Sequence, residues 1–383
     1  MKIMLEKSSL RNILFYFAYS IYLAYNLLDT SFYSKYIQGF GNLLIITILV
    51  MLIFKEAFDF KINSRDLMLF IILAIVAGLF YSYMGYNYAI LPFFIYAARN
   101  VNITTILKIS YRISLTLLIF IIVSSYLGWI TNYITYEGGR EREYVGFRYS
   151  LFGSAILCNI IFLKIYLEKD NIKWRTLVLL TIGNYALYEF TDSRLTFGLG
   201  MVLLFLTMLI KIFPKFKRIL MSKITIASYV FSGILSLYFT IGYNHLSEWH
   251  SNINEFLGGR LSLGYSTLKY YGYGFFGKEI SLVGNGLDVD GYTTTATYDY
   301  VDNLYVQLLL KLGLLFLIIF ILGMTLVMIR VYRLNDVYLY IIFSLLALHG
   351  IVDDLMILPH YNSFWFVIAA LFYKTKLDTQ NNG

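Results

Sequence analysis

Twelve stretches of this chain are apolar for long enough to suggest helices that cross a lipid bilayer. A spanning helix needs about 20 predominantly apolar residues, roughly 17–25. The fourth and twelfth stretches have only about 13 residues, so they are re-entrant or extend into flanking aromatics. The stretches cover residues 12–28, 38–54, 67–83, 86–98, 113–130, 150–167, 176–190, 195–213, 224–242, 304–329, 337–351 and 361–373. The pattern predicts an all-α, polytopic membrane protein with about twelve transmembrane helices.

The composition supports this fold class. Of the 383 residues, 59% are hydrophobic and 14% are charged, whereas soluble domains have about 45–50% and 25%. So few charges cannot cover a water-soluble body, and we expect one integral membrane domain over residues 1–383. The single cysteine, Cys158, excludes a disulfide framework and a cysteine zinc site. The four histidines show no metal-ligand spacing, so we expect neither a metal nor a cofactor.

The distribution of Lys and Arg predicts the orientation. With a cytoplasmic N-terminus, 22 of the 31 basic residues fall in cytoplasmic segments, as the positive-inside rule requires. These segments are 1–11, 55–65, 99–112, 164–175, 211–223, 330–333 and 374–376. Both termini are then cytoplasmic, in a multi-pass protein of the cell (cytoplasmic) membrane. The basic residues are scattered over short loops and form no nucleic-acid-binding patch, so we expect no nucleic acid partner.

Two of the predicted outer loops are long, residues 131–149 and 243–303. The second lies between the ninth and tenth predicted helices and is rich in aromatic, glycine and acidic residues. Long loops of this kind are often functional. Aromatic faces among carboxylates and amides suit sugar recognition. The alternative is an aromatic belt at the membrane interface.

Ionisable and polar residues collect near the outer ends of the last helices. His349 and Asp353 are four residues apart and share a helical face; they have either a catalytic role or a structural one. Further polar residues recur every four positions into the tenth helix, and Asp302 lies beside them. They predict a polar stripe that lines a cavity, with Lys311 about 10 Å below the surface; alternatively, Lys311 snorkels to the interface. The stripe consists of Asp299, Asn303, Gln307 and Lys311.

Several arginines lie on the predicted outer face, where positive residues are disfavoured. Arg148 opens the sixth span, Arg194 follows a short turn, and Arg260 follows two glycines. A guanidinium binds two oxygens at once, so an anion such as a diphosphate is a fitting ligand. The alternative is pairing with nearby acidic residues. Arg142 stands between Glu141 and Glu143, which we expect to neutralise it.

Short motifs in these regions resemble those of Wzy-type polysaccharide polymerases and the related O-antigen ligases. The run TDSRLT, with Arg194 at the mouth of a helix, resembles their Ser-Arg signature. RYSLFG from Arg148 is similar to the arginine that opens a span after their earlier outer loop. Gly259-Arg260-Leu261 followed by Gly272-Tyr273-Gly274 looks like their Arg-then-Gly-x-Gly stretch. The motif that closes their long loop resembles Asp302-Asn303-Leu304-Tyr305, followed by Lys311-Leu312-Gly313-Leu314.

This resemblance implies a membrane glycosyltransferase that polymerises lipid-linked oligosaccharide repeat units into a surface polysaccharide, such as a capsule, exopolysaccharide or O-antigen. The growing glycan would pass from undecaprenyl diphosphate to the terminal sugar of an incoming lipid-linked unit, on the outer face. The partners would be these lipid-linked oligosaccharides, membrane lipid, and flippase and chain-length regulator proteins. The expected catalytic residues are Asp302, His349 and Asp353. The expected substrate-binding residues are Arg148, Arg194, Arg260, Asn303, Tyr305 and Lys311.

Two other functions fit the sequence. A ligase would use the same donor and another acceptor, but ligases usually carry a histidine where this chain has Asp302, which favours the polymerase. A flippase or transporter of lipid-linked oligosaccharides would also be polytopic. Transporters are commonly built from matched halves, and the sequence shows no internal repeat.

Overall fold

The computed structural model describes residues 2–58, 63–137, 140–284, 286–292 and 298–372. Helices dominate the described chain, with one short hairpin of two strands. In chain order the elements are α1 (Lys2–Asp29), α2 (Ser34–Ile37), α3 (Gly41–Phe58), α4 (Ser64–Tyr83), α5 (Tyr86–Ala98), α6 (Ile103–Tyr126), β1 (Ile134–Glu137), β2 (Arg140–Glu143), α7 (Ser150–Glu168), η1 (Lys169–Asn171), α8 (Trp174–Thr191), α9 (Arg194–Ile212), α10 (Phe216–Leu220), η2 (Lys223–Ala227), α11 (Ser228–Ile241), α12 (Glu248–Phe256), α13 (Arg260–Tyr271), α14 (Leu304–Leu334), α15 (Val337–Val352), η3 (Leu355–Ile357) and α16 (Trp365–Phe372).

Every apolar stretch in the sequence overlaps one of these helices. Seven of the described helices are long and apolar enough to cross a membrane, and α15 is a shorter apolar helix. The seven are at Gly41–Phe58, Ser64–Tyr83, Ile103–Tyr126, Ser150–Asn171, Arg194–Ile212, Lys223–Ile241 and Leu304–Leu334. The protein is therefore an all-α, membrane-embedded protein. The number of twelve spans stays a prediction.

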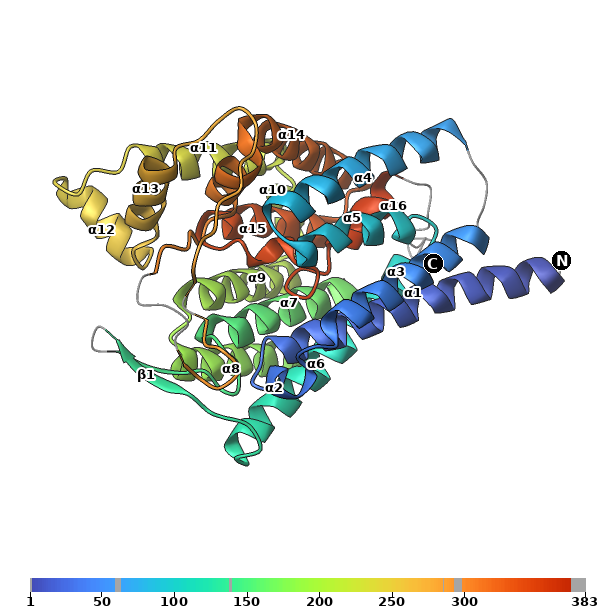
Figure 1. Cartoon of the computed structure of the whole chain (residues 1–383), viewed down its shortest axis with the longest axis horizontal. Helices are drawn as coiled ribbons and strands as arrows, with labels where there is room; N and C mark the ends of the chain where they lie inside the picture. The colour runs from blue at the N-terminus through green and yellow to red at the C-terminus, as the bar shows by residue number, and fades with distance from the viewer. Residues whose placement is uncertain (1, 59–62, 138–139, 285, 293–297, 373–383) are drawn as a thin grey trace.

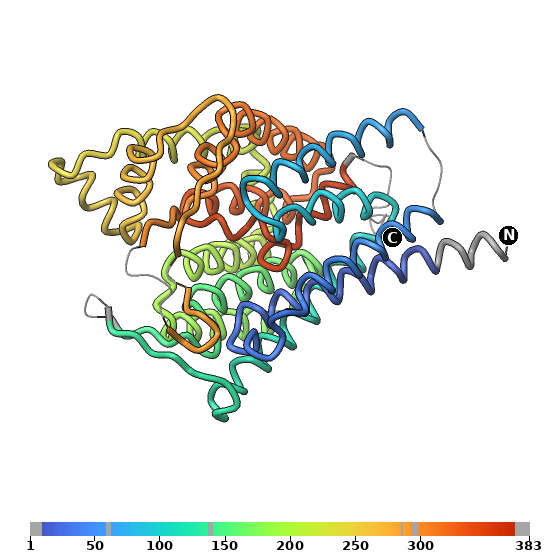
Figure 2. The backbone as a smooth tube through the Cα atoms, viewed as in Figure 1, coloured from blue at the N-terminus to red at the C-terminus, as the bar shows by residue number. Residues whose placement is uncertain are grey.

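The bundle has two distinct ends (Figures 1 and 2). The end of α3 and helix α16 lie toward one end, which we call the terminal end. Helices α12 and α13 of the long loop, and strands β1 and β2, lie at the opposite end, which we call the loop end. The two strands are antiparallel and pair Ile134 with Glu143. The sequence did not predict this hairpin.

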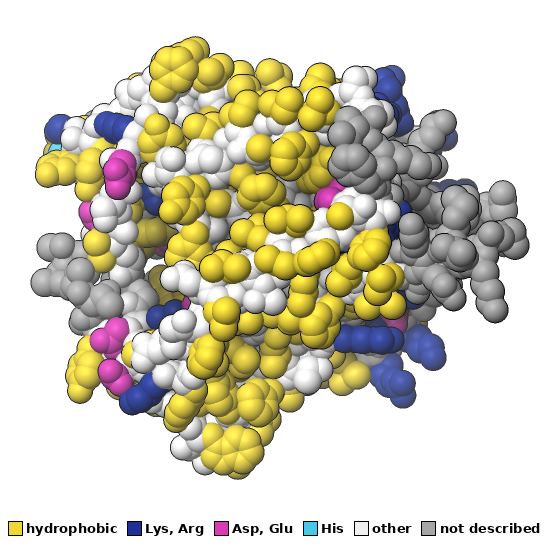
Figure 3. Space-filling view, turned by 45° about the vertical axis from the view of Figure 1, so that its right-hand side comes forward, with side chains coloured by type: hydrophobic (Ala, Val, Ile, Leu, Met, Phe, Trp, Pro, Cys, Tyr) yellow, Lys and Arg dark blue, Asp and Glu magenta, His cyan; other side chains and the backbone are white. Residues whose placement is uncertain are grey.

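Apolar side chains cover the surface between the two ends. Figure 3 shows them across most of one face, with several Lys and Arg side chains at the edge nearest the terminal end. Exposed positions include Ile53, Leu179 and Ile319. Soluble proteins rarely expose such large continuous apolar areas, so this surface fits contact with lipid.

Helix α7 is the most enclosed of the candidate spans. Most of its residues are buried among other parts of the protein, whereas α4 is largely exposed. Small and polar residues such as Gly153, Ser154 and Asn159 let neighbouring helices approach it. Its first turn contains the buried residues Ser150 and Gly153, so this turn is largely enclosed by protein.

Helix α14 breaks at Gly313, where φ is 87° and ψ is 171°. A Cβ atom on Gly233 of α11 would lie 2.7 Å from Ile321 and 3.4 Å from Tyr305. In a straight helix those two residues would be about 24 Å apart. The segment before Gly313 therefore does not continue the axis of the segment after it. Residues 304–310 are all buried, whereas Ile318, Ile319 and Leu322 beyond the break are exposed.

The long loop satisfies the backbone groups that this break leaves unpaired. Both ends of a helix carry backbone groups that lack intrahelical partners, and lipid offers none. Here Lys278 N donates to Lys311 O at 3.1 Å, while Leu314 N donates to Gly274 O at 3.0 Å. A third bond joins Leu315 N to Phe275 O at 3.1 Å. We call residues 272–278 the capping segment.

Candidate functional site

The first turn of α7 is the common neighbour of the three predicted anion-binding arginines. Arg148 immediately precedes the turn. The Ser193 hydroxyl, one residue before Arg194, donates to Ser150 O at 3.4 Å. Tyr149, the residue that caps α7, lies near Arg260. Burial raises the pKa of Tyr149, and the positive charge of Arg260 opposes this shift. Segments distant in the sequence thus converge at the loop end.

Arg260 is the most enclosed of the three arginines, with 13% of its side chain exposed. It begins α13, after Gly258 and Gly259, which both adopt positive φ. Its Nε donates to Val352 O at 2.7 Å and its Nη1 donates to Leu257 O at 3.0 Å. Its Nη2 lies 3.6 Å from Asp302 Oδ2. The guanidinium is therefore held in one orientation, with a carboxylate beside it.

Arg194 is half exposed, at 49% of its side chain, and its Nε donates to Asp192 Oδ1 at 3.1 Å. Asp192 adopts a left-handed backbone conformation at the end of α8. Its other oxygen lies 3.9 Å from Arg142 Nε. Arg142 therefore has a carboxylate close to it besides those of its sequence neighbours, because the folded hairpin brings Arg142 to Asp192. Glu143 instead accepts from the Tyr126 hydroxyl at 2.7 Å.

Arg148 ties three segments together. Its Nε and Nη2 donate to Asp29 O at 3.1 and 2.7 Å. Its backbone N donates to Thr30 O, and its backbone O accepts from Leu287 N at 2.8 Å. These bonds make Arg148 a structural link. Its side chain is 25% exposed, so its guanidinium also places a positive charge beside the first turn of α7.

Asp302 combines burial with a positive neighbour. Burial raises the pKa of Asp302 to about 6, with Arg260 opposing this shift and Asp353 adding to it. The Tyr298 hydroxyl also donates to Asp302 Oδ2 at 2.9 Å. In turn, burial disfavours the charged form of Arg260, but the carboxylates of Asp302 and Asp353 raise its pKa. At neutral pH both groups are charged.

No protein-family model, curated protein or solved structure matches this chain.

His349 and Asp353 lie together at the end of α15, as their spacing predicts. Their closest side-chain atoms, Nε2 and Oδ2, are 3.8 Å apart, which is too long for a hydrogen bond. Both side chains are only 5% exposed. His349 Nε2 has no hydrogen-bond partner among the described residues, and Asp353 Oδ1 accepts from Leu355 N. Such burial leaves little access for a substrate.

Asp354 completes a cluster of three carboxylates with Asp302 and Asp353. It accepts from the Tyr300 hydroxyl at 2.5 Å. Burial, and then the charge of Asp353, raise the pKa of Asp354, while the Lys311 ammonium acts in the opposite sense. Asp354 is not among the site residues that the sequence predicts, although an adjacent pair of aspartates in an apolar region is a signal that could have found it. Among the described residues, no group of three metal-ligating side chains is placed to hold a metal ion.

The predicted polar stripe does not form a helical face. Helix α14 begins only at Leu304, and Asn303 has an extended backbone with φ −160°. Asn303 Oδ1 accepts from Val306 N at 3.1 Å and from the Ser236 hydroxyl at 2.9 Å. Asp299 Oδ1 accepts from Val283 N, and Gln307 Nε2 donates to Val301 O. These bonds hold the entry into α14, so the four residues do not form one continuous stripe along a single helix.

Tyr305 and Lys311 are also placed differently from the expectation. Tyr305 is fully buried and its hydroxyl donates to Ala347 O at 2.9 Å, which indicates a packing role. Lys311 lies two residues before the break, with its carbonyl bound to the capping segment. It is therefore near the end of a short enclosed helix, and not two turns into a single long span.

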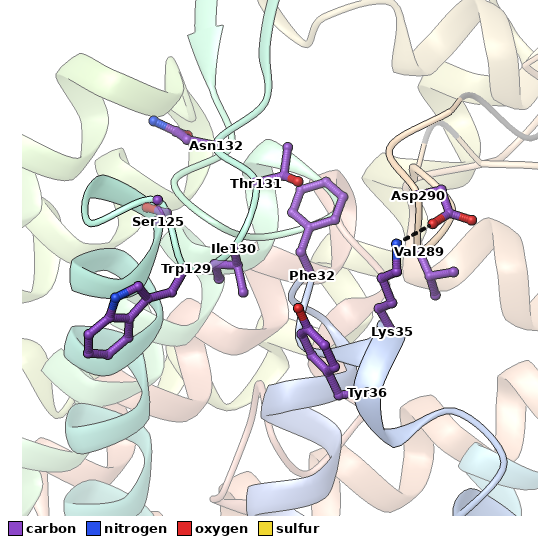
Figure 4. A pocket seen from close by; sticks show the side chains of 11 residues that line it. Phe32, Lys35, Tyr36, Ser125, Trp129, Ile130, Thr131, Asn132, Val289 and Asp290 are labelled. Atoms are coloured by element: carbon purple, nitrogen blue, oxygen red, sulfur yellow. Dashed lines mark hydrogen bonds and ion pairs between the residues drawn. The ribbon is translucent and has the colours of Figure 1, made fainter.

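A hollow of about 440 Å³ opens at the loop end, beside the segment that carries Arg148 (Figure 4). At its rim, Lys35 Nζ forms an ion pair with Asp290 Oδ1 at 2.8 Å, and both side chains are about half exposed. Phe32 N donates to Gly146 O, two residues before Arg148. The lining comes from the connection α1–α3, the end of α6 with the connection to β1, and the long loop: Phe32, Lys35, Tyr36, Ser125, Gly128, Trp129, Ile130, Thr131, Asn132, Val289 and Asp290.

Proposed function

We propose that the protein is a membrane glycosyltransferase that polymerises lipid-linked oligosaccharide repeat units, with its loop end on the outer face of the cytoplasmic membrane. The observation that carries the proposal is the convergence of three arginine-bearing segments on the first turn of α7, next to the carboxyl group of Asp302. The donor and the acceptor are both linked to undecaprenyl diphosphate.

The leaving group of this reaction is a diphosphate. The bond between the anomeric carbon of the growing glycan and the diphosphate oxygen breaks, and negative charge develops on that oxygen. Preorganised cations stabilise such charge, and a helix N-terminus adds a favourable partial charge. Arg194 is the most exposed of the three arginines, so it is best placed to meet the diphosphate, and Arg148 and Arg260 add positive charge around the first turn of α7.

The acceptor hydroxyl attacks the anomeric carbon and loses its proton to a general base. Asp302 is the best candidate, because its side chain is 15% exposed whereas that of Asp353 is 5% exposed. A pKa of about 6 leaves Asp302 ionised at neutral pH and basic enough to accept a proton. His349 and Asp353 then support the cluster around Asp302 from behind.

The hollow at Phe32 and Asp290 gives the sugars of a repeat unit a place beside Arg148. Its lining combines aromatic rings with amide, hydroxyl, ammonium and carboxylate groups, which suit sugar rings and hydroxyls. Its position next to residues 146–148 supports a path from the bound glycan to the reacting centre.

Reconstitution tests this function directly. Purified protein in liposomes should convert synthetic undecaprenyl-diphosphate-linked repeat units into a ladder of longer products, and Asp302→Asn should abolish the ladder. The absence of polymer from wild-type protein supplied with the natural repeat unit of its own cell would exclude polymerase activity.

A deletion strain separates the alternatives. Loss of a polymerase leaves single repeat units on the lipid carrier. Loss of a flippase removes all outward-facing lipid-linked repeats. Loss of a ligase leaves full-length polymer on the carrier lipid. Only the first result agrees with the proposal.

A further inference from the structure

The capping segment exposes two large apolar side chains at the break in α14. Phe275 is 54% exposed and Phe276 is 72% exposed. They share this part of the surface with Leu314 and Leu315, whose backbone N–H groups bind the carbonyls of Gly274 and Phe275. Both leucines are about a third exposed. The phenylalanines therefore extend the apolar outer face of α14 beyond the helix itself.

The length of α14 beyond the break indicates how deep Phe275 and Phe276 lie in the bilayer. The 16 uncharged residues from Leu314 to Ile329, which precede Arg330, extend about 24 Å at 1.5 Å per residue. The hydrocarbon core of a bilayer is about 30 Å thick. With Arg330 at the opposite interface, Gly313 therefore lies at or just inside the edge of the hydrocarbon at the loop end. The packing of Phe316 against Phe80, three residues from the end of α4, is consistent with that level.

The backbone of the capping segment contacts the backbone of α14 too closely for a side chain to fit between them. A Cβ atom on Gly277 would collide with Lys311 O, and one on Gly313 would collide with the backbone of Phe276. The capping segment is therefore held directly against α14. Phe275 and Phe276 have no freedom to withdraw from that level while the three backbone bonds persist.

We propose that the capping segment is a membrane anchor of the long loop, with Phe275 and Phe276 inserted among the acyl chains of the loop-end leaflet. Lipid is the partner because the phenylalanines continue the exposed apolar surface of α14 at the edge of its bilayer-spanning segment. The anchor fixes the C-terminal end of α13, whose first residue is Arg260, at a constant height above the hydrocarbon. This inference does not depend on the proposed function.

Spin labels measure the depth of these side chains. Single cysteines replace Phe275 or Phe276 in a Cys158→Ser background, and the labelled protein is reconstituted in phosphatidylcholine and phosphatidylglycerol vesicles. Power saturation then compares collisions with oxygen, which concentrates in lipid, and with a water-soluble nickel complex. Labels at Phe275→Cys and Phe276→Cys should favour oxygen, with a depth just inside the acyl chains.

Two further positions calibrate the measurement. Leu322→Cys, on the exposed face of α14, should report a deeper site. Tyr292→Cys, 71% exposed in the same long loop, should report water. The anchor is refuted if labels at 275 and 276 collide with the nickel complex as often as the label at 292. A Gly323→Ala variant carrying the label at 276 should keep the membrane value, whereas Gly313→Ala should shift it toward water.

Discussion

Asp302, Asp353 and Asp354 form a cluster of carboxylates, and their different exposures decide which of them can contact an acceptor sugar. Asp353 and Asp354 are almost completely enclosed, while Asp302 retains an opening and lies 3.6 Å from Arg260. Because burial raises the pKa of Asp302 to about 6, the basic form is lost as the pH falls through that value. Transfer should therefore rise with pH through about 6 and level off above it.

Measurement of initial rates of polymer formation over roughly pH 5–8 checks this dependence. Asp302→Asn should lower the rate by about 10²–10⁴-fold and remove the rise near pH 6. Asp353→Asn removes a negative neighbour that helps to raise the Asp302 pKa, so it should move the rise to lower pH. A retained rise near pH 6 in Asp302→Asn would assign the titrating group elsewhere.

Arg194 should not tolerate lysine. Its guanidinium donates to Asp192 while remaining half exposed, so a planar fork is oriented toward an incoming anion. Lysine keeps the charge and loses that geometry. We expect Arg194→Lys to lose much of the activity and Arg194→Ala about 10²–10³-fold, measured as polymer formed per unit of membrane protein. Arg260→Lys should behave similarly, because it has three defined contacts.

The control for these variants belongs at the other end of the molecule. Arg142→Ala is unsuitable, because Arg142 lies near the same Asp192 that orients Arg194. Arg175 is exposed in the first turn of α8, near the terminal end, and Arg175→Ala should leave the rate unchanged. Full activity of Arg194→Lys and Arg260→Lys would mean that these residues supply only charge, or only fold.

At the scale of elements, the break in α14 provides a test of how the long loop is held. Gly313 has a backbone conformation that side chains rarely adopt, and a Cβ there would meet the backbone of Phe276. Gly313→Ala should destabilise the protein by at least about 1–3 kcal/mol, as should Gly277→Ala, where the collision is with Lys311 O. The thermal midpoint in detergent, followed by size-exclusion chromatography, measures the loss.

The same helix contains its own control. Gly323 has open space around the position of a Cβ and lies within the helical part of α14. Gly323→Ala should be neutral or slightly stabilising, by about 0.4–1 kcal/mol. Equal thermal midpoints for Gly313→Ala and Gly323→Ala would show that the break is not required for the fold.

Sequence reasoning located the helices because a long apolar run in a protein with so few charges has few alternatives. It placed the ends of the helices less well, because capping residues determine where a helix begins and ends. Helix α6 begins at Ile103, ten residues before the expected start, and the side chain of its cap Asn102 accepts a hydrogen bond from Thr105 N. It brought His349 to Asp353 through helical spacing. It misplaced the stripe from Asp299 to Lys311, because the extended backbone before Leu304 and the break at Gly313 depend on contacts with residues far away in the chain.

At the scale of the whole molecule, the separation of the two ends makes orientation testable. Tyr292→Cys lies in the long loop and Lys215→Cys in the exposed connection between α9 and α10. In a Cys158→Ser background, a membrane-impermeant maleimide should label position 292 in intact cells and position 215 only after permeabilisation. The expectation follows from the excess of Lys and Arg on the terminal side. The reverse labelling would place the arginine-lined site inside the cell.

The capping segment also sets an order of events during biosynthesis. Its residues leave the ribosome more than thirty positions before Leu315, the last residue to bind them. With the loop end outside, the segment must already have been translocated when the spanning part of α14 enters the bilayer. The unpaired backbone N–H groups of Leu314 and Leu315 can then bind the carbonyls of Gly274 and Phe275, which already lie at the same depth. Insertion of α14 and closure of the long loop thus become a single step, and the exported loop is not fastened until Leu314 and Leu315 have themselves reached the bilayer.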